Sequence, residues 1–546
     1  TSGCANLIRA WHDPIINPRC RAQHLKNGKR KEYNVDVNIG SFLARRADIS
    51  PDREAYVDSA TGYRLSFAAL NQRVNQLAHQ LRSQGVGQGD RVALCLMNSA
   101  EFIESFLAIA KAGGVVVPLN WRLVADELEF IIKDSGAKTM IFGTEFETVV
   151  SDLASRGDKT DVRHWLQVGG QCLPFAEEYE QFLNAGGKEE PSVGASGDDL
   201  LYIMYTSGTT GLPKGVVHTH ATSFWALLTF QASCDLRDGD RYLVALPLFH
   251  VGALTPVALN IYRGVTSVVM RDFDPTRAWQ VIRDEKIGGS LLVPAMLNFM
   301  LQVPDAATGY DHLRWIQSGA SPLPVSIIEQ YADLDIEIHQ IYGLTETCGP
   351  ACVISADDAM RKIGSTGKAF FHTEVRVVDE TGEDCAPGEQ GEVWVKGNHI
   401  MREYWHRPEA TAETITQEGW LRTGDVASID DDGFVFIQDR IKDMIISGGE
   451  NVYPAEIENV ILTHPEVVEV AVIGQPSSKW GESPFAIVVA KSDQLSKDDV
   501  LAHCQGKLAR FKLPKDAAFV EVIPRNANGK VLKRVLRESF PGPALE

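Results

Sequence analysis

Residues 206–215 read Thr-Ser-Gly-Thr-Thr-Gly-Leu-Pro-Lys-Gly, directly after an apolar run at 201–205 that predicts a short buried strand. Glycines let a backbone approach a ligand closely, while backbone N–H groups, hydroxyls and a lysine can donate to phosphate oxygens. The run is not a P-loop, which ends in Gly-Lys-Ser/Thr, because Pro213 precedes Lys214 and Gly215 follows it. It therefore predicts a phosphate-binding turn at a strand end, with a plain surface turn as the alternative.

The bulk composition narrows the class of protein. With 546 residues the chain is too long for one hydrophobic core and is expected to form several domains. Its formal net charge of -19 argues against a general nucleic-acid-binding protein, whose binding face is basic. Nine cysteines without a Cys-x-x-Cys pair predict reduced, packed thiols in a cytoplasmic protein. The uncharged stretch between Arg241 and Arg263 contains proline, glycine and asparagine, which favours a buried strand, loop and helix over a membrane span.

Helices and apolar strands alternate from about residue 36, which predicts parallel sheets with helices on both faces. Ser66 is placed to cap the first long amphipathic helix. After about residue 364, short strands among turns predict an antiparallel, barrel-like subdomain. From about residue 443 the pattern predicts a small α+β unit. We therefore expect an α/β protein with a poorly ordered extension at 1–35.

Four further clusters place polar side chains in loops, at 342–346 (Tyr-Gly-Leu-Thr-Glu), 423–425 (Thr-Gly-Asp), 439–442 (Asp-Arg-Ile-Lys) and 529–530 (Gly-Lys). The first lies just past an expected strand end, where open α/β sheets bind ligands. Alone, each cluster is typical of a structural turn, a charged linker or a terminal lysine. Together with the phosphate run, and in this order, they call for another interpretation than five separate structural turns.

With these clusters the chain resembles the adenylate-forming superfamily over about residues 36–535, and most closely its bacterial fatty-acyl-CoA synthetases, through residues 246–251 and 445–458. The resemblance implies that a carboxylate attacks the α-phosphate of ATP, which gives an acyl-adenylate and pyrophosphate, and that a thiol then displaces AMP.

The resemblance also implies the domain organisation. The large N-terminal AMP-binding domain would span 36–439 and contain two stacked α/β subdomains and the barrel-like subdomain at about 364–439. A hinge at 440–442, pivoting at Lys442, would lead to a small mobile C-terminal domain at 443–546.

The family's binding residues carry over by motif. For ATP and AMP the resemblance implies Thr206, Ser207, Gly208, Thr209, Thr210, Gly211, Lys214, Gly319, Ala320, Ser321, Gln340, Tyr342, Gly343, Thr345, Asp425, Arg440 and Lys530. It places Thr206 and Glu346 near Mg²⁺, a hard cation that carboxylate and phosphate oxygens satisfy. The implied catalytic residues are Lys530, Glu346, Thr345 and His250, and those on the CoA side are Gly448, Gly449 and Trp480. Lys530 would bridge the acyl carboxylate and the α-phosphate as negative charge builds between them.

The class of carboxylic acid substrate is inferred from the implied acyl pocket, which contains His250, Val251, Gly252, Ala253, Cys348 and Gly349. Amino-acid-activating relatives have an aspartate where Val251 stands, so an amino-acid substrate is disfavoured. Small and apolar residues suit an unbranched alkyl chain, so we expect a medium- to very-long-chain fatty acid. An aromatic or other small acid, and transfer of the acyl group to a carrier protein, stay open, and a core histidine is the alternative for His250.

The expected ligands are ATP, CoA, a carboxylic acid and Mg²⁺. A non-catalytic binding protein would predict the loss of Lys530, Glu346 or Lys214, and all three are present. The basic segment at 26–31 is the local support for a peripheral membrane contact, and a homodimer stays open.

Overall fold

The computed structural model describes residues 37–206, 213–320, 323–440, 443–447, 450–477, 480–492, 494–508, 510, 512–525 and 531–542. The expected extension at 1–35 and the hinge residue Lys442 lie outside these ranges. Within them, no helix combines the length and the apolar character that crossing a membrane requires. The uncharged stretch is a strand, a loop and a helix, as predicted.

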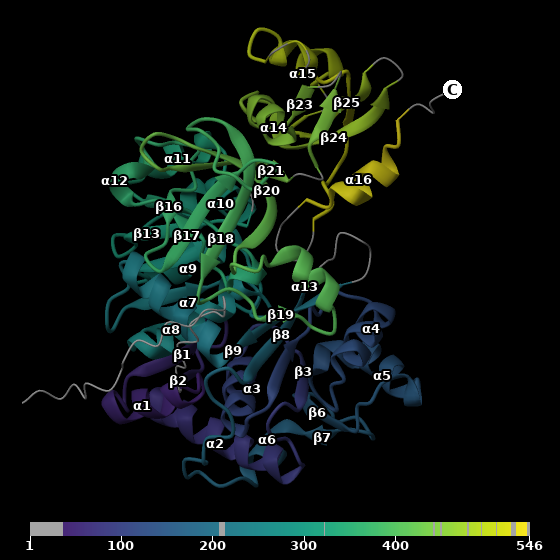
Figure 1. Ribbon diagram of the computed structural model, residues 1–546. Coiled ribbons are helices and arrows are strands. Elements are labelled where there is room, and N and C mark those ends of the chain that lie inside the picture. The colour runs from purple at the N-terminus through teal and green to yellow at the C-terminus, as the bar shows by residue number, and fades with distance from the viewer. Residues whose placement is uncertain are drawn as a thin grey trace, which may run out of the picture. The chain divides into compact units, whose positions relative to one another are not determined.

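An eight-stranded sheet carries the phosphate run. Its strand order is β19-β9-β8-β4-β3-β5-β6-β7. Figure 1 labels β19, β9, β8, β3, β6 and β7 of this sheet. The strand β8 is parallel to β4, whereas β9 and β19 are antiparallel additions at one edge. The bounds are β3 (Arg91–Cys95), β4 (Val115–Pro118), β5 (Thr139–Gly143), β6 (His164–Val168), β7 (Glu177–Glu178), β8 (Leu200–Thr206), β9 (Lys214–Thr219) and β19 (Glu403–Tyr404). The apolar run before the phosphate turn is thus a buried strand, as predicted.

A nine-stranded sheet carries the 342–346 cluster. Its order is β16-β15-β14-β13-β12-β10-β11-β1-β2, with β14, β13, β12, β10, β11 and β1 parallel to their neighbours in that run. The bounds are β1 (Glu54–Asp58), β2 (Arg64–Ser66), β10 (Arg241–Val244), β11 (Thr266–Val269), β12 (Gly289–Leu292), β13 (Trp315–Ser318), β14 (Glu337–Tyr342), β15 (Cys352–Val353) and β16 (Lys368–Ala369).

One helical layer packs against both sheets. Its helices α2 (Phe67–Ser83), α3 (Ala100–Ala112), α7 (His220–Ser233) and α8 (Val251–Arg263) share a hydrophobic core with strands of each sheet. The side chain of Ser66 caps α2 by accepting a hydrogen bond from the Ala69 N–H at 3.2 Å, as predicted. A second core lies on the outer face of each sheet. The expected pair of stacked α/β subdomains is confirmed.

The other helices cover the outer faces or link strands. The helices α4 (Ala125–Ser135) and α5 (Glu147–Ser155) cover the eight-stranded sheet, and α9 (Pro275–Asp284), α10 (Pro294–Leu301) and α11 (Val325–Ala332) cover the nine-stranded sheet. The remaining helices of this part are α1 (Ser41–Ile49), α6 (Tyr179–Asn184), α12 (Ala356–Ala359), α13 (Pro408–Thr414), η1 (Thr144–Phe146), η2 (Gly157–Lys159), η3 (Pro304–Ala306) and η4 (Thr345–Thr347).

Two smaller sheets follow. The region expected to be barrel-like is a four-stranded antiparallel sheet, formed by β17 (Thr373–Val378), β18 (Gln390–Gly397), β20 (Leu421–Ile429) and β21 (Val435–Arg440). The predicted α+β unit contains β22 (Ile445–Ser447), β23 (Glu450–Val452), β24 (Val467–Ser477), β25 (Gly481–Ala490) and β26 (Asp516–Phe519), with α14 (Pro454–Leu462), α15 (Lys497–Cys504) and α16 (Lys533–Ser539).

A buried carboxylate joins two helices of the shared layer. Glu104 in α3 has no exposed surface and accepts hydrogen bonds at 3.1 Å from Arg73 Nη2 in α2 and from the Tyr179 hydroxyl. Burial raises the pKa of Glu104, and the Arg73 guanidinium opposes that shift. A buried charge of this kind is tolerated because it is paired.

We expect Arg73→Met to lower the free energy of unfolding by about 3 kcal/mol near neutral pH and by less under mildly acidic conditions. Without its partner, Glu104 has a folded-state pKa still further above the unfolded value, so folding takes up a proton and stability falls as pH rises. Urea unfolding at several pH values measures this, with Arg237→Met at an exposed ion pair as the control. A loss that does not depend on pH would contradict the account.

Candidate active site

The phosphate run connects two antiparallel strands. Thr206 at the end of β8 is the register partner of Lys214 at the start of β9. A Cβ added to Gly215 would stand 2.7 Å from a side-chain carbon of Ile203 and 3.2 Å from Trp405 Cβ, so this strand start requires glycine. The structure therefore brings the hydroxyl residue and the lysine of the run to one strand end. Outside the described residues lie Ser207, Gly208, Thr209, Thr210 and Gly211.

The 342–346 cluster is a tight turn between β14 and η4. A Cβ added to Gly343 would lie 1.5 Å from the Gly349 carbonyl oxygen, which only glycine at that position allows. Cys348 ends the turn with a left-handed φ of 57°. This close approach fixes the start of η4, which contains Thr345 and Glu346.

Three successive carbonyl oxygens of η4 each accept a hydrogen bond from another part of the chain. Thr345 O accepts from His218 Nε2 at 2.7 Å, Glu346 O from the Met401 N–H at 2.7 Å, and Thr347 O from His399 Nδ1 at 2.9 Å. A carbonyl only accepts, so each of these ring nitrogens carries a proton. Burial lowers the pKa of His218 and of His399 to about 4, so both rings are neutral near pH 7.

The second nitrogen of each ring has a hydroxyl beside it. His218 Nδ1 lies 3.1 Å from Thr222 Oγ1, and His399 Nε2 lies 2.8 Å from Thr373 Oγ1. The carbonyl that each ring contacts sets its tautomer, and the bare nitrogen of the ring then faces a threonine hydroxyl.

The residues expected at adenine and at ribose meet between the end of β14 and the middle of β20, a strand of another sheet. The Tyr342 hydroxyl donates to Asp425 Oδ2 at 2.6 Å, and Asp425 is the register partner of Arg440. Beside β14, a Cβ on Gly319 would lie 2.5 Å from the Ile341 carbonyl oxygen, and Ala320 has a left-handed φ of 71°. The chain after β13 thus passes so close to β14 that only glycine fits at position 319. The neighbouring Gln340 uses its Nε2 to donate to Ser365 O at 3.0 Å, and Ser321 lies outside the described residues.

Glu346 and Lys214 meet at one side chain. The Tyr404 hydroxyl donates to Glu346 Oε1 at 2.8 Å, and Lys214 Nζ lies 4.8 Å from the centre of the Tyr404 ring. The described residues contain no group of three or more His, Cys, Asp or Glu side chains arranged around a metal. A single carboxylate at Glu346 with the Thr206 hydroxyl is the donor set by which Mg²⁺ usually binds beside substrate phosphates, so these residues fit that ion.

The residues expected around the acyl group also come together. His250 precedes α8, whose first turn contains Val251, Gly252 and Ala253, and Thr255 Oγ1 in the next turn donates to the Cys348 carbonyl at 3.1 Å. A Cβ on Gly349, whose φ is 117°, would lie 3.1 Å from the Phe230 ring. The turn after η4 is therefore packed against α7 and α8.

His250 itself is unusual. Burial of the His250 ring, with Arg122 nearby, lowers its pKa to about 3. Its Nε2 is buried, and no described residue forms a hydrogen bond with it. An unpaired ring nitrogen fits a group held for a ligand better than it fits a hydrogen-bonded core histidine.

The residues expected on the CoA side are only partly described. Trp480 follows β24 and is 43% exposed. Gly448, Gly449 and Lys530 lie outside the described residues.

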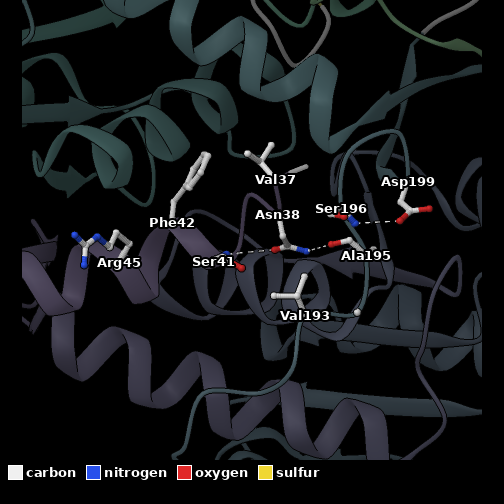
Figure 2. A pocket seen from close by; sticks show the side chains of 10 residues that line it. Val37, Asn38, Ser41, Phe42, Arg45, Val193, Ala195, Ser196 and Asp199 are labelled. Atoms are coloured by element: carbon white, nitrogen blue, oxygen red, sulfur yellow. Dashed lines mark hydrogen bonds between the residues drawn. The ribbon is translucent and has the colours of Figure 1, made fainter. Parts of the chain in front are cut away.

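A cavity of about 600 Å³ lies elsewhere, beside the start of α1 (Figure 2). Asn38 there donates to Ala195 O at 2.6 Å, and the Ser196 N–H donates to Asp199 at 3.0 Å. The residues that line it are Val37, Asn38, Ser41, Phe42, Arg45, Val193, Gly194, Ala195, Ser196 and Asp199, none of which the sequence assigns to the site. This cavity is therefore distinct from the candidate site.

Sequence reasoning missed three side chains that touch the site, namely His218, His399 and Tyr404. One signal was available for His218, which stands inside the apolar strand that directly follows the phosphate run. Neither His399 nor Tyr404 belongs to a recognisable pattern, so nothing local marked them.

Comparison with known proteins gives a consistent result. A family model described as AMP-binding enzyme matches residues 43–405, and one described as AMP-binding enzyme C-terminal domain matches residues 456–530. The long-chain-fatty-acid–CoA ligase FadD13 of Mycobacterium tuberculosis is 46% identical over 507 residues, which cover 92% of this chain and 98% of that protein. A feruloyl-CoA synthase of an Amycolatopsis species is 38% identical over 92% of this chain and 99% of its own length. A solved Mycobacterium tuberculosis fatty acyl CoA synthetase is 45% identical, covers 92% of this chain and 98% of its own, and has a TM-score of 0.75.

The neutral histidines predict acid sensitivity. The pKa of His218, about 4, lies below the value of about 6.5 in an unfolded chain, so its contribution to stability is full above pH 6.5 and is lost as pH falls toward 4. The variant His218→Gln keeps a donor near Nε2 but cannot titrate. Between neutral pH and about pH 4.5 we expect the free energy of unfolding to fall by roughly 2 kcal/mol less in this variant than in the unaltered protein.

Unfolding free energies across this pH range measure the effect, with His312→Gln at an exposed position as the control. Parallel curves for His218→Gln and the unaltered protein would contradict the assignment.

Proposed function

The chain belongs to the AMP-binding enzyme family, and from that premise we propose that it is an ATP-dependent ligase that joins a fatty acid to coenzyme A. In the first step a carboxylate oxygen attacks the α-phosphorus of ATP, and pyrophosphate leaves. In the second the CoA sulfur attacks the acyl carbon, AMP leaves and the thiol proton is released. The observation that carries the proposal is that Tyr404 joins Lys214 of the phosphate run to Glu346 of the 342–346 cluster, whose Tyr342 hydroxyl donates to Asp425 in β20.

Each group has a role that its chemistry fits. The hairpin that begins at Thr206 and ends at Lys214 would hold the β- and γ-phosphates, and Thr345 would meet the α-phosphate. Tyr342 would lie against adenine, with Asp425 and Arg440 at the ribose. Mg²⁺, held by Thr206 and Glu346, would supply positive charge to the phosphate oxygens when bound.

The first step brings two anions together, so preorganised cations are expected to supply most of the rate enhancement. We assign to Lys530 the role of stabilising the negative charge that develops between the acyl carboxylate and the α-phosphate. The small domain at 443–546 would then turn about the hinge at 440–442, withdraw Lys530 and present Gly448, Gly449 and Trp480 to CoA.

The acyl group would lie near His250. The relative at 46% identity is named for long-chain fatty acids, and the packed, small residues Cys348 and Gly349 beside α8 suit an alkyl chain. An aromatic acid is the second candidate, because a feruloyl-CoA synthase is 38% identical over almost its full length. A cytoplasmic location is part of the proposal and agrees with the free cysteines of the described residues.

The substrate assignment is tested by AMP release from ATP across a panel of acids, with and without CoA. We expect release that needs both CoA and a medium- to very-long-chain fatty acid. A preference for ferulate-like acids would favour the second candidate. Release that requires a carrier protein, or that never occurs, would contradict the proposal.

The two-conformation assignment is tested at Lys530. We expect Lys530→Ala to slow adenylate formation by a factor on the order of 10²–10³, the usual effect of removing one transition-state donor. Thioester formation from supplied acyl-adenylate should be unchanged, because Lys530 is withdrawn in that step. Lys515→Ala, at an exposed lysine of the same domain, is the control. Equal losses in both half-reactions would contradict domain alternation.

A further inference from the structure

A short segment outside every recognised motif touches both sides of the candidate site. Residues 399–404, here called the brace, lie between β18 and α13. His399 and the Met401 N–H hold the η4 carbonyls. The next residues pair with β9, through the register Glu403↔Val217 and Tyr404↔Val216. The brace therefore links the strand that begins at Lys214 to the turn that carries Glu346.

Within the brace, Tyr404 is the residue whose side chain contacts both Glu346 and Lys214. It is 7% exposed, and its backbone N–H donates to Thr411 Oγ1 at 3.0 Å. Its backbone is therefore held by Thr411 as well as by the pairing with β9. Its hydroxyl meets Glu346 Oε1 at 2.8 Å, and its ring lies 4.8 Å from Lys214 Nζ.

This geometry has a clear electrostatic effect. A phenol that donates to Oε1 fixes the carboxylate rotamer and leaves Oε2, which has no hydrogen-bond partner among the described residues, for a cation. The face of the same ring attracts the ammonium of Lys214. Lys214 and Glu346 carry opposite charges and both contact Tyr404, so without the ring we expect them to attract each other in competition with substrate.

We propose that Tyr404 is a positioning residue that keeps Glu346 and Lys214 apart and aimed at Mg²⁺ and the phosphates of ATP. The inference rests on the proposed function, because it assigns those two ligands to this site. The hydroxyl, through Glu346, contributes to the affinity for ATP with Mg²⁺. The ring, through Lys214, contributes to the affinity for ATP whether or not the metal is present.

Calorimetric titration of the full chain with AMP, with ATP and EDTA, and with ATP and Mg²⁺ separates these effects. We expect Tyr404→Phe, which keeps the ring, to weaken binding of ATP with Mg²⁺ about tenfold, the size expected for one hydrogen bond to a charged group. Binding of AMP and of metal-free ATP should stay within about twofold. Tyr404→Leu should weaken metal-free ATP as well, by a further factor of about ten, because Lys214 can then pair with Glu346.

The control is Tyr331→Phe, which removes the hydroxyl of another buried tyrosine, one that donates to Leu297 O at 3.0 Å. This variant should alter the melting temperature and leave all three nucleotide affinities unchanged. Equal weakening of AMP and of ATP with Mg²⁺ in Tyr404→Phe would overturn the inference in favour of a general packing role, and so would unchanged binding of ATP with Mg²⁺. An unaltered protein that binds none of these nucleotides would instead overturn the proposed function.

Discussion

Three neighbouring carbonyl groups, at Thr345, Glu346 and Thr347, hold the candidate site in place. Within η4 itself, among the described residues, only the Thr345 carbonyl has a local partner, the Cys348 N–H at 3.0 Å, and an unpaired buried carbonyl is destabilising by about 1–3 kcal/mol. The donors come from β9 and from the brace, which belong to the eight-stranded sheet or to its edge, whereas η4 follows a strand of the nine-stranded sheet. These hydrogen bonds therefore fix the phosphate side of the site relative to the adenine side.

The same arrangement explains why the two donor rings are histidines. Each donates to a carbonyl through one nitrogen and places a bare nitrogen beside a threonine hydroxyl, which a neutral imidazole does and a lysine or an arginine cannot. Burial keeps both rings neutral and so protects this division of roles. Neither ring therefore adds positive charge to the candidate site near neutral pH.

Local patterns predicted the strands, the cap at Ser66 and the position of the phosphate run, because each depends on neighbours within a few residues. The meeting of the Tyr342 and Asp425 side chains was not foreseen, although both residues were assigned to the nucleotide through the family likeness. The brace was missed altogether. Tyr404 is 58 residues from Glu346, His399 is 52 from Thr347, and the Met401 donor is a backbone N–H with no side-chain signature. Contacts of this range depend on tertiary packing, which carries no periodic signal.

The edge strand β19 has a consequence for how the protein is made. The strand β19 pairs with β9 at the edge of the sheet. Because β9 ends at Thr219 and β19 begins at Glu403, β19 is synthesised long after the strand with which it pairs. Until then a nascent chain presents β9 as an open sheet edge, the kind of surface on which polypeptides aggregate. It also lacks two of the three donors to η4. A chain that ends before Tyr404 therefore has both an uncovered sheet edge at β9 and an incompletely held η4.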